Sequence, residues 1–544
     1  MATMEAPPRV ATRVHDTPYK NEAFVDFTKE ENVRKMRSAL DKVRGQLGRE
    51  YDLIIGGKRL KTADKIKSIN PAKPSEMVGI HQKAGKEHVE PAVQAALKAF
   101  ATWSLVPVEE RAGLLFRVAD VMRERKLEYM AWLVFEVSKN WLEADADISE
   151  TIDFCEFYGR EALRLAQAET PIQLPGERDT LTYIPLGVGA VIPPWNFAAA
   201  IMAGMTVASI VCGNTVVLKP SSDSPTIAAK FIELLEECGM PEGVVNFCPG
   251  GGATFGDAVV SHPKVRYIAF TGSREVGLHI NQSAAHQQPG QLWIKRTVLE
   301  MGGKDGIIVD ADADIDSAVE GVAQAAFGFQ GQKCSACSRA IIDERIYDKF
   351  LEKLKTRVEK ITVGDPESNP GMAAVINEGS MKDILNYIEI GKKEGRLITG
   401  GGRAPGEGYF VQPTVIADIQ PKSKLEQEEI FGPVLAVIKS RNFDHALEIA
   451  NDTEFGLTGA VYSSSREKLD RAVREFYVGN LYLNRKCTGA MVGAHPFGGF
   501  NMSGTDSKAG GPDYLLLFTQ AKSVAEKIGY AGPVAERQEE GLGL

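Results

Sequence analysis

Short apolar runs alternate with helical periodicity between residues 180 and 300. The apolar runs predict strands at Val188–Ile192, Thr215–Leu218, Val244–Phe247 and Val265–Phe270. The amphipathic stretches between them predict helices at Phe197–Val211, Pro225–Cys238, Ala253–Ser261 and Glu275–Ala285. Strands that read as continuous apolar runs, with helices between them, are typical of a parallel sheet covered on both faces.

The same alternation starts again at Gly306. It predicts strands at Gly306–Val309, Arg339–Ile342, Tyr409–Ile419, Val434–Lys439 and Gly459–Ser463, and helices at Ile315–Gly328 and Arg345–Lys360. A chain of 544 residues is long enough for two or three domains. We therefore predict an α/β protein with two Rossmann-like domains, whose boundary lies near Glu300.

The N-terminal third has a different, mainly helical pattern. Helices are predicted at Thr28–Leu47, Glu90–Phe100, Pro107–Leu133 and Ile148–Ala168. The stretch from Thr180 to Leu218 has no charged residue or histidine, but prolines and glycines interrupt it before one membrane-spanning helix is complete. We interpret this stretch as a buried strand–helix–strand unit, and we predict no membrane partner.

Charge and cysteine content narrow the class of protein. The net charge of −9, with no basic stripe, argues against a nucleic-acid partner. Seven cysteines, an odd number scattered along a long chain, indicate reduced thiols and a cytoplasmic location. The N-terminus lacks the apolar stretch of a secretory signal.

A cysteine and a glutamate, each close to glycine, are the main catalytic candidates. Cys334 lies among small residues in the segment 331–336, where nearby backbone N–H groups favour an exposed thiolate. Glu300 stands before Gly302 and Gly303 at the end of an apolar run, and its carboxylate is expected to face a cleft. Such a pair can form and then hydrolyse a thioester. Each residue also has an ordinary alternative, a packing cysteine or a turn glutamate.

A metal or redox role for the cysteines is a weaker hypothesis. Cys334 and Cys337 form a Cys-x-x-Cys pair, a spacing found in zinc and redox sites. No second pair of this kind exists, and the eight histidines form no ligand-spaced cluster. We predict no metal site.

Three further segments place polar groups at the ends of predicted strands. Asn196 begins a predicted helix, where its amide is either a helix cap or an oxyanion donor. Lys219, with Ser222 behind it, lies at the carboxyl end of a strand, where α/β sheets bind ligands. Gly272 and Ser273 join a strand to a helix N-terminus, which suits a pyrophosphate, although the Gly-x-Gly-x-x-Gly fingerprint is absent.

Together these segments resemble the aldehyde dehydrogenase superfamily over roughly residues 50 to 525. The carriers are Pro-Trp-Asn-Phe (194–197), Leu-Lys-Pro-Ser (218–221), Phe-Thr-Gly-Ser (270–273), Glu-Met-Gly-Gly-Lys (300–304), Gly-Gln-Lys-Cys (331–334), Glu-Glu-Ile-Phe-Gly-Pro (428–433) and Pro-Phe-Gly-Gly (496–499). Within the superfamily, residues 327–336, 484–490 and 502–514 are similar to the delta-1-pyrroline-5-carboxylate dehydrogenase subfamily in its stand-alone form.

The resemblance implies a reaction and roles for these residues. Cys334 is expected to attack the aldehyde of L-glutamate 5-semialdehyde, with Asn196 and the Cys334 N–H holding the oxyanion and Glu300 activating water. The implied cofactor is NAD, with Trp195, Lys219, Ser222, Gly272, Ser273, Glu429 and Phe431 at its site. The implied substrate residues are Ser335, Gly489, Ala490 and Phe497, of which Gly489 and Ala490 form a backbone anchor for the carboxylate.

One departure from the family bears on the choice of cofactor. Many NAD-preferring relatives have a glutamate three residues after the lysine, where this chain has Ser222. We therefore expect tolerance of NADP as well as NAD. Two alternatives stay open: an aldehyde dehydrogenase for another semialdehyde, and a binding protein on the same scaffold. The presence of Cys334, Glu300 and Asn196 together argues against the second.

The resemblance also implies a domain division and partners. The expected parts are residues 1–173 (arm and first part of the NAD domain), 174–188 (oligomerisation hairpin), 189–299 (NAD domain), 300–493 (catalytic domain) and 494–544 (return, oligomerisation strand and tail). The strands of the oligomer surface are predicted at Leu181–Tyr183 and Lys522–Ile528. We expect a homo-oligomer, either a dimer or a hexamer built from dimers, and a transient contact with proline dehydrogenase.

Overall fold

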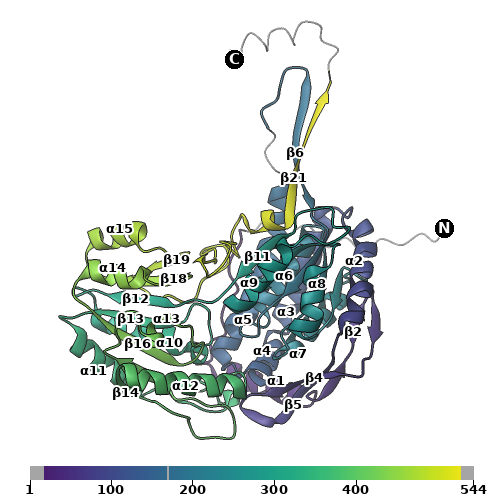
Figure 1. Ribbon diagram of the computed structural model, residues 1–544. Coiled ribbons are helices and arrows are strands. Elements are labelled where there is room, and N and C mark those ends of the chain that lie inside the picture. Colours follow the sequence, from purple (N-terminus) through teal and green to yellow (C-terminus); the bar gives the residue numbers. More distant parts are fainter. Residues whose placement is uncertain (1–17, 168–170, 529–544) are drawn as a thin grey trace.

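The computed structural model describes residues 18–167 and 171–528. Figure 1 shows two lobes, each built around its own sheet, and a long ribbon that projects from the first lobe. Both main sheets have seven strands, which confirms the predicted pair of α/β units. None of the helices in the described ranges combines the length and the apolar character that a membrane span requires.

The first sheet runs in the order β11-β10-β7-β8-β9-β2-β3. Its strands are β11 (Arg296–Glu300), β10 (Val265–Thr271), β7 (Val188–Ile192), β8 (Thr215–Leu218), β9 (Val245–Phe247), β2 (Leu53–Ile55) and β3 (Lys58–Leu60). The strands from β11 to β9 are parallel, and β2 and β3 complete the sheet in antiparallel fashion. The sequence did not predict β2 and β3, because a strand of three residues is too short to display a period.

Helices cover the first sheet and form a block beside it. They are α1 (Glu30–Arg44), α2 (Val89–Trp103), α3 (Val108–Glu124), α4 (Lys126–Val137), α5 (Trp141–Ala166), α6 (Ala200–Val211), α7 (Pro225–Glu237), α8 (Asp257–Ser261) and α9 (Arg274–Ala285). The predicted helix Pro107–Leu133 is in fact two helices, which meet at Arg125. Helix α5 starts earlier than predicted because the side chain of Asn140 accepts a hydrogen bond from the Glu143 N–H and caps it.

The second sheet runs in the order β14-β15-β16-β13-β12-β18-β19. Its strands are β14 (Arg396–Thr399), β15 (Thr414–Ala417), β16 (Val434–Ser440), β13 (Cys337–Asp343), β12 (Asp305–Val309), β18 (Thr458–Tyr462) and β19 (Asn480–Leu483). Only β14 is antiparallel to its neighbour. The helices of this lobe are α10 (Ile315–Phe327), α11 (Tyr347–Val358), α12 (Glu378–Glu394), α13 (Lys424–Gln427), α14 (Phe443–Asn451) and α15 (Arg466–Glu475).

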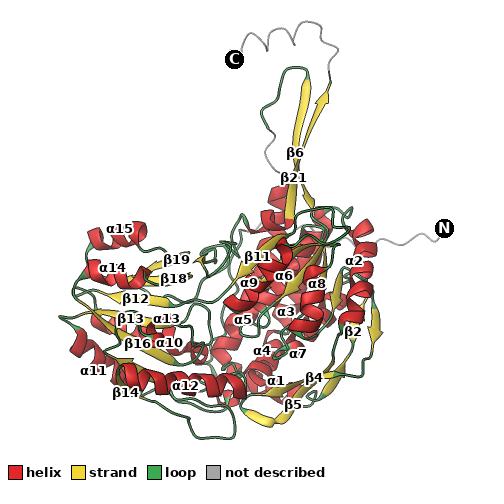
Figure 2. Cartoon of the chain, in the orientation of Figure 1, coloured by secondary structure: helices red, strands yellow, loops and turns green. Residues whose placement is uncertain are grey.

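Three smaller sheets complete the fold. One joins β1 (Arg49–Tyr51), β5 (Lys73–Gln82) and β4 (Lys65–Asn70), and another pairs β17 (Phe455–Gly456) with β20 (Phe500–Asn501). The projecting ribbon in Figures 1 and 2 pairs β6 (Glu177–Pro185) antiparallel with β21 (Thr519–Lys527). This pairing brings together most of the two strands predicted for the oligomer surface, Leu181–Tyr183 and Lys522–Ile528, so the strand within 174–188 has its partner at residues 519–527.

Candidate active site

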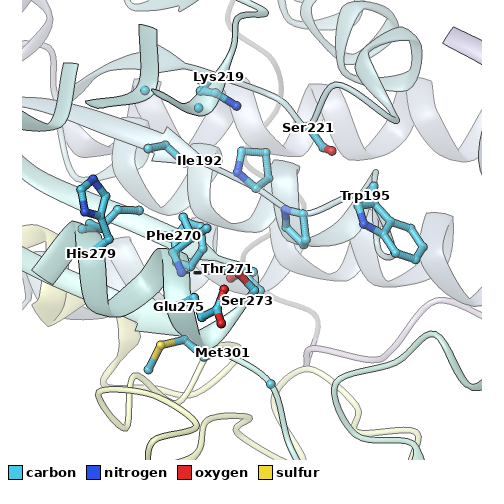
Figure 3. A pocket seen from close by; sticks show the side chains of 18 of the residues that line it. Ile192, Trp195, Lys219, Ser221, Phe270, Thr271, Ser273, Glu275, His279 and Met301 are labelled. Atoms are coloured by element: carbon cyan, nitrogen blue, oxygen red, sulfur yellow. Dashed lines mark hydrogen bonds between the residues drawn. The ribbon is translucent and has the colours of Figure 1, made fainter. Parts of the chain in front are cut away.

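A cleft of about 770 Å³ opens at the carboxyl ends of the first sheet's strands. Figure 3 shows part of its lining, with His279 and Trp195 at opposite ends. All seven residues predicted for the cofactor line this one cleft: Trp195, Lys219, Ser222, Gly272, Ser273, Glu429 and Phe431. The fold thus brings together motifs that are more than two hundred positions apart. Five of these residues follow strands β7, β8 and β10 of the first sheet, whereas Glu429 and Phe431 come from the segment between α13 and β16 of the second lobe.

One end of the cleft carries groups suited to hydroxyls and phosphates. Lys219 follows β8 directly, and burial lowers the pKa of its ammonium to about 8. Ser273 is the N-cap of α9, with its hydroxyl accepting from the Val276 N–H at 3.4 Å. A Cβ on Gly252 would meet no atom within 4 Å, so the turn beside Lys219 leaves open space in the cleft. A helix N-terminus with space before it favours an anion.

The other end of the cleft carries a carboxylate. Trp195 and Phe431 meet edge to face with ring centroids 5.5 Å apart. Glu429 accepts a hydrogen bond from the Gly303 N–H at 3.0 Å, and burial raises its pKa to about 7. A Cβ on Gly302 would lie 2.1 Å from a Glu429 oxygen, which explains why glycine is needed there. The residues of the cleft fit a dinucleotide: an ammonium, a helix N-terminus and a carboxylate along one trough.

A second pocket, of about 180 Å³, lies on the other side of Cys334. Cys334 lines both cavities, and Glu300 lines the smaller one. The four residues predicted for the substrate, Ser335, Gly489, Ala490 and Phe497, all line the smaller pocket too. A thiol therefore stands at the junction between a dinucleotide-sized trough and a pocket for a small molecule.

Cys334 follows a strained turn and precedes β13. Phe329, Gln330 and Gly331 all have positive φ values, of 50°, 57° and 68°. Burial, followed by the nearby carboxyl groups of Asp305, Glu300 and Glu429, raises the pKa of the Cys334 thiol well above its usual value. This direction is opposite to the one expected for a favoured thiolate, because burial, and after it three acidic side chains, outweigh the backbone N–H groups.

Asn196 connects the two lobes beside the cysteine. Its amide donates to the carbonyl of Gln332 at 3.1 Å, and its side chain is buried. The helix-cap alternative is wrong, because α6 begins later and its N-cap, Ala199, has no side-chain hydrogen bond. Its second N–H makes no hydrogen bond with the residues that the structure describes, so it can donate to another acceptor near Cys334.

Glu300 is the last residue of β11 and lies against the segment 498–508. Its Oε1 accepts a hydrogen bond from the Ser507 hydroxyl. Burial raises its pKa to about 7, while the Ser507 hydroxyl and the N–H groups of Ser507 and Gly499 act in the opposite direction. Within the described chain, Oε2 has no hydrogen-bond partner. The carboxyl group therefore titrates near neutrality with one oxygen held and the other unpaired.

The sequence missed an acidic stripe on α5 that lines the smaller pocket. Glu143, Glu150 and Asp153 recur at helical spacing on the face that borders the pocket. Burial and Asp147 raise the pKa of Glu150 to about 8, and Glu143 forms a 2.7 Å ion pair with Lys333. The spacing of these acids was visible in the sequence, but nothing there indicated which face of the helix would meet a pocket.

A fully buried ion pair supports this side of the site. Lys139 and Asp147 lie 2.8 Å apart with no exposed side-chain surface. The Lys139 ammonium lies 4.3 Å from the centroid of Phe197 and 4.6 Å from that of Phe329. The pair thus links the residue after Asn196 to the strained turn before Cys334.

Comparison with known proteins gives a consistent result. Residues 59–524 match the aldehyde dehydrogenase family. The chain is 57% identical over 510 residues to 1-pyrroline-5-carboxylate dehydrogenase of Geobacillus thermodenitrificans, covering 94% of this chain and 99% of that protein. It is similar to the crystal structure of 1-pyrroline-5-carboxylate dehydrogenase from Thermus with bound NAD, at 52% identity and a TM-score of 0.92, over 94% of this chain and 99% of that one. It also matches proline utilization A of Bdellovibrio bacteriovorus, at 44% identity and a TM-score of 0.92, over 94% of this chain and 53% of that one.

Proposed function

The chain belongs to the aldehyde dehydrogenase family, and from this premise we propose that it oxidises L-glutamate 5-semialdehyde to L-glutamate with NAD. The semialdehyde is the ring-opened form of 1-pyrroline-5-carboxylate, and the reaction is a step in proline and arginine breakdown. The observation that carries the proposal is the position of Cys334, which lines both the dinucleotide cleft and the smaller pocket.

The first step is attack of the Cys334 sulfur on the aldehyde carbon. The thiol must lose its proton first, and Glu300, with a pKa near 7, is the acceptor that we assign; it releases this proton to solvent before the hydrolysis step. The oxyanion that forms would be held by the free Asn196 N–H and the backbone N–H of Cys334. NAD, when bound, supplies the hydride acceptor. Hydrolysis of the resulting thioester then requires a base, and Glu300 has the unpaired oxygen for it.

Recognition of the substrate's carboxylate is assigned to the loop 485–490. Arg485 donates to the carbonyl groups of Thr488 and Gly489, at 3.1 Å each, which fixes those carbonyls on the Arg485 side. Gly489 has a φ of 80°. Alternating backbone geometry of this kind turns successive N–H groups to one side and forms an anion nest. Ser335 and Phe497 complete this end of the pocket.

Recognition of the substrate's ammonium is assigned to the acidic stripe of α5. Glu150 and Asp153 line the same pocket as the anchor loop. Asp153 already accepts from the Glu22 N–H at 2.7 Å and from the Asn21 amide at 2.9 Å, so Glu150 is the acid with more capacity for a cation. A pocket with an anion nest and a free acid favours an amino acid aldehyde over a simple one.

A substrate panel tests this proposal. NADH production is measured with pyrroline-5-carboxylate, succinate semialdehyde and propionaldehyde under one set of conditions. We expect the highest kcat/KM for pyrroline-5-carboxylate, because only its open form carries both charged groups. Equal efficiency on all three would contradict the assigned substrate and favour a broad aldehyde dehydrogenase.

The proposal also covers the roles of the domains, the oligomeric state, the cellular location and the protein partner. We assign the cofactor role to residues 189–299 and the catalytic role to 300–493. The ribbon of β6 and β21 supports a homo-oligomer, since most of β21 is exposed. A cytoplasmic location and a transient contact with proline dehydrogenase remain predictions; the likeness to proline utilization A supports the second.

A further inference from the structure

We infer that Ser507 is a positioning residue for the catalytic base, holding Glu300 so that its free oxygen serves thioester hydrolysis. The inference rests on the proposed role of Glu300. Ser507 lies 207 positions from Glu300 and is only 3% exposed. Its hydroxyl donates to Oε1, and its own N–H also acts on the same carboxyl group. One residue thus supplies two donors to one carboxylate.

Glycines make the fit around this carboxylate tight. A Cβ on Gly498 would lie 3.0 Å from Oε1, and one on Gly504 would lie 3.2 Å from it. The same segment is tied to β11 by the Thr505 N–H, which donates to the Leu299 carbonyl at 2.9 Å. The carboxyl group therefore has little freedom to turn, and the Ser507 donors decide which oxygen faces the pocket.

In this geometry the two oxygens of the Glu300 carboxyl group have different roles. Oε1 is occupied by the serine, whereas Oε2 has no partner in the described chain. In hydrolysis, the water oxygen bonds to the thioester carbon while its proton passes to Oε2. The C–S bond then breaks and its electron pair returns to the Cys334 sulfur. A carboxylate that could rotate would offer Oε2 to the water for only part of the time.

Other charged and titratable groups also face this carboxyl group. Lys508 lowers the Glu300 pKa, while Cys334 and Tyr514 are the titratable groups across the pocket. The Lys508 ammonium is held by the carbonyls of Gly479 and Gly498, at 2.8 Å each. These groups stay in place when the Ser507 hydroxyl is removed. A change in the pH profile of a Ser507 variant therefore reports the lost hydrogen bond.

The test compares Ser507→Ala, Ser507→Cys and Ser507→Thr by stopped-flow and steady-state kinetics. For Ser507→Ala we expect a full NADH burst in the first turnover. Steady-state hydrolysis should be slower by about 10- to 100-fold, because one hydrogen bond to a charged group is lost. The acid limb of kcat should move to higher pH, because the carboxylate loses a donor that stabilises its charged form. Ser507→Thr should restore both readouts, and Ser507→Cys, a weaker donor, should be intermediate.

Two controls separate the possible failures. Thr505→Val removes a hydroxyl group from the same segment. That hydroxyl accepts a hydrogen bond from the Leu299 N–H at 3.0 Å and does not contact the carboxylate. The acid limb of the kcat profile should therefore stay in place in this variant. Wild-type hydrolysis and pH profile in Ser507→Ala, alongside slow hydrolysis in Glu300→Gln, would overturn the role of Ser507 alone. Unimpaired hydrolysis in Glu300→Gln would overturn the base assignment, and this inference with it.

Discussion

The two cavities that share Cys334 are built in different ways. The dinucleotide cleft is lined mostly by residues 192–280, which come from successive strand ends and the turns after them. The smaller pocket takes most of its lining from α5, the start of α6, the cysteine loop, the loop 489–497 and the segment 509–514. Local motifs therefore specify the first cavity, whereas the tertiary fold specifies the second.

The strongest way to separate the two cavities is Cys334→Ala. We expect turnover to fall by more than about 10⁴-fold, since a nucleophile that forms a covalent intermediate is removed. NAD binding, measured by isothermal titration calorimetry, should be retained because the cleft depends on Cys334 only at its edge. Surviving turnover would refute the nucleophile assignment.

A second change acts on the support beneath both cavities. Lys139→Met leaves Asp147 as an unpaired buried charge, and we expect a loss of about 3–5 kcal/mol of stability. The thermal unfolding temperature and the activity should both fall. The control is Arg178→Ala in the exposed pair with Glu526, where the loss should stay below about 1 kcal/mol. Similar effects for the two pairs would argue against a supporting role for Lys139.

A third change affects the smaller pocket alone. Gly489→Ala places a side chain at a φ of 80°, which costs about 1–2 kcal/mol and should move the anchor N–H groups. We expect KM for pyrroline-5-carboxylate to rise by about 5- to 30-fold, with no change in KM for propionaldehyde. Gly239→Ala, at a φ of 90° and with no atom near its Cβ, is the matched control. Equal changes in both KM values would count against the anchor.

The smallest expected effect concerns the cleft alone. With Ser222 where many relatives have a glutamate, we expect measurable NADP turnover that is weaker than NAD turnover. Ser222→Glu should reduce the NADP rate further, because its carboxylate repels a 2′-phosphate, while leaving the NAD rate nearly unchanged. A strict absence of NADP activity in the unmodified enzyme would contradict this expectation.

The same contrast explains what the sequence could predict. Strands such as β7 and β8 were predicted to the residue, because a polar or turn-forming residue stands at each end of these apolar runs. Cys334 and Glu300 were found through their glycines. The direction of the Cys334 pKa shift differs from the expected one, since the burial of the thiol and the approach of Asp305 and Glu429 arise only on folding. The role of Ser507 was not predicted either, because a serine in a loop has no distinctive sequence signal and this one meets Glu300 only after folding.

The pairing of β6 with β21 has a consequence for synthesis of the protein. Their paired side chains Arg178 and Glu526 are 348 positions apart, so a ribosome needs roughly 20–70 s to join them at about 5–20 residues per second. During that interval β6 is a strand without its neighbour, which is a template for pairing with another chain. The nascent polypeptide therefore depends on its last residues to shield a strand made early, and a shortened C-terminus should favour aggregation.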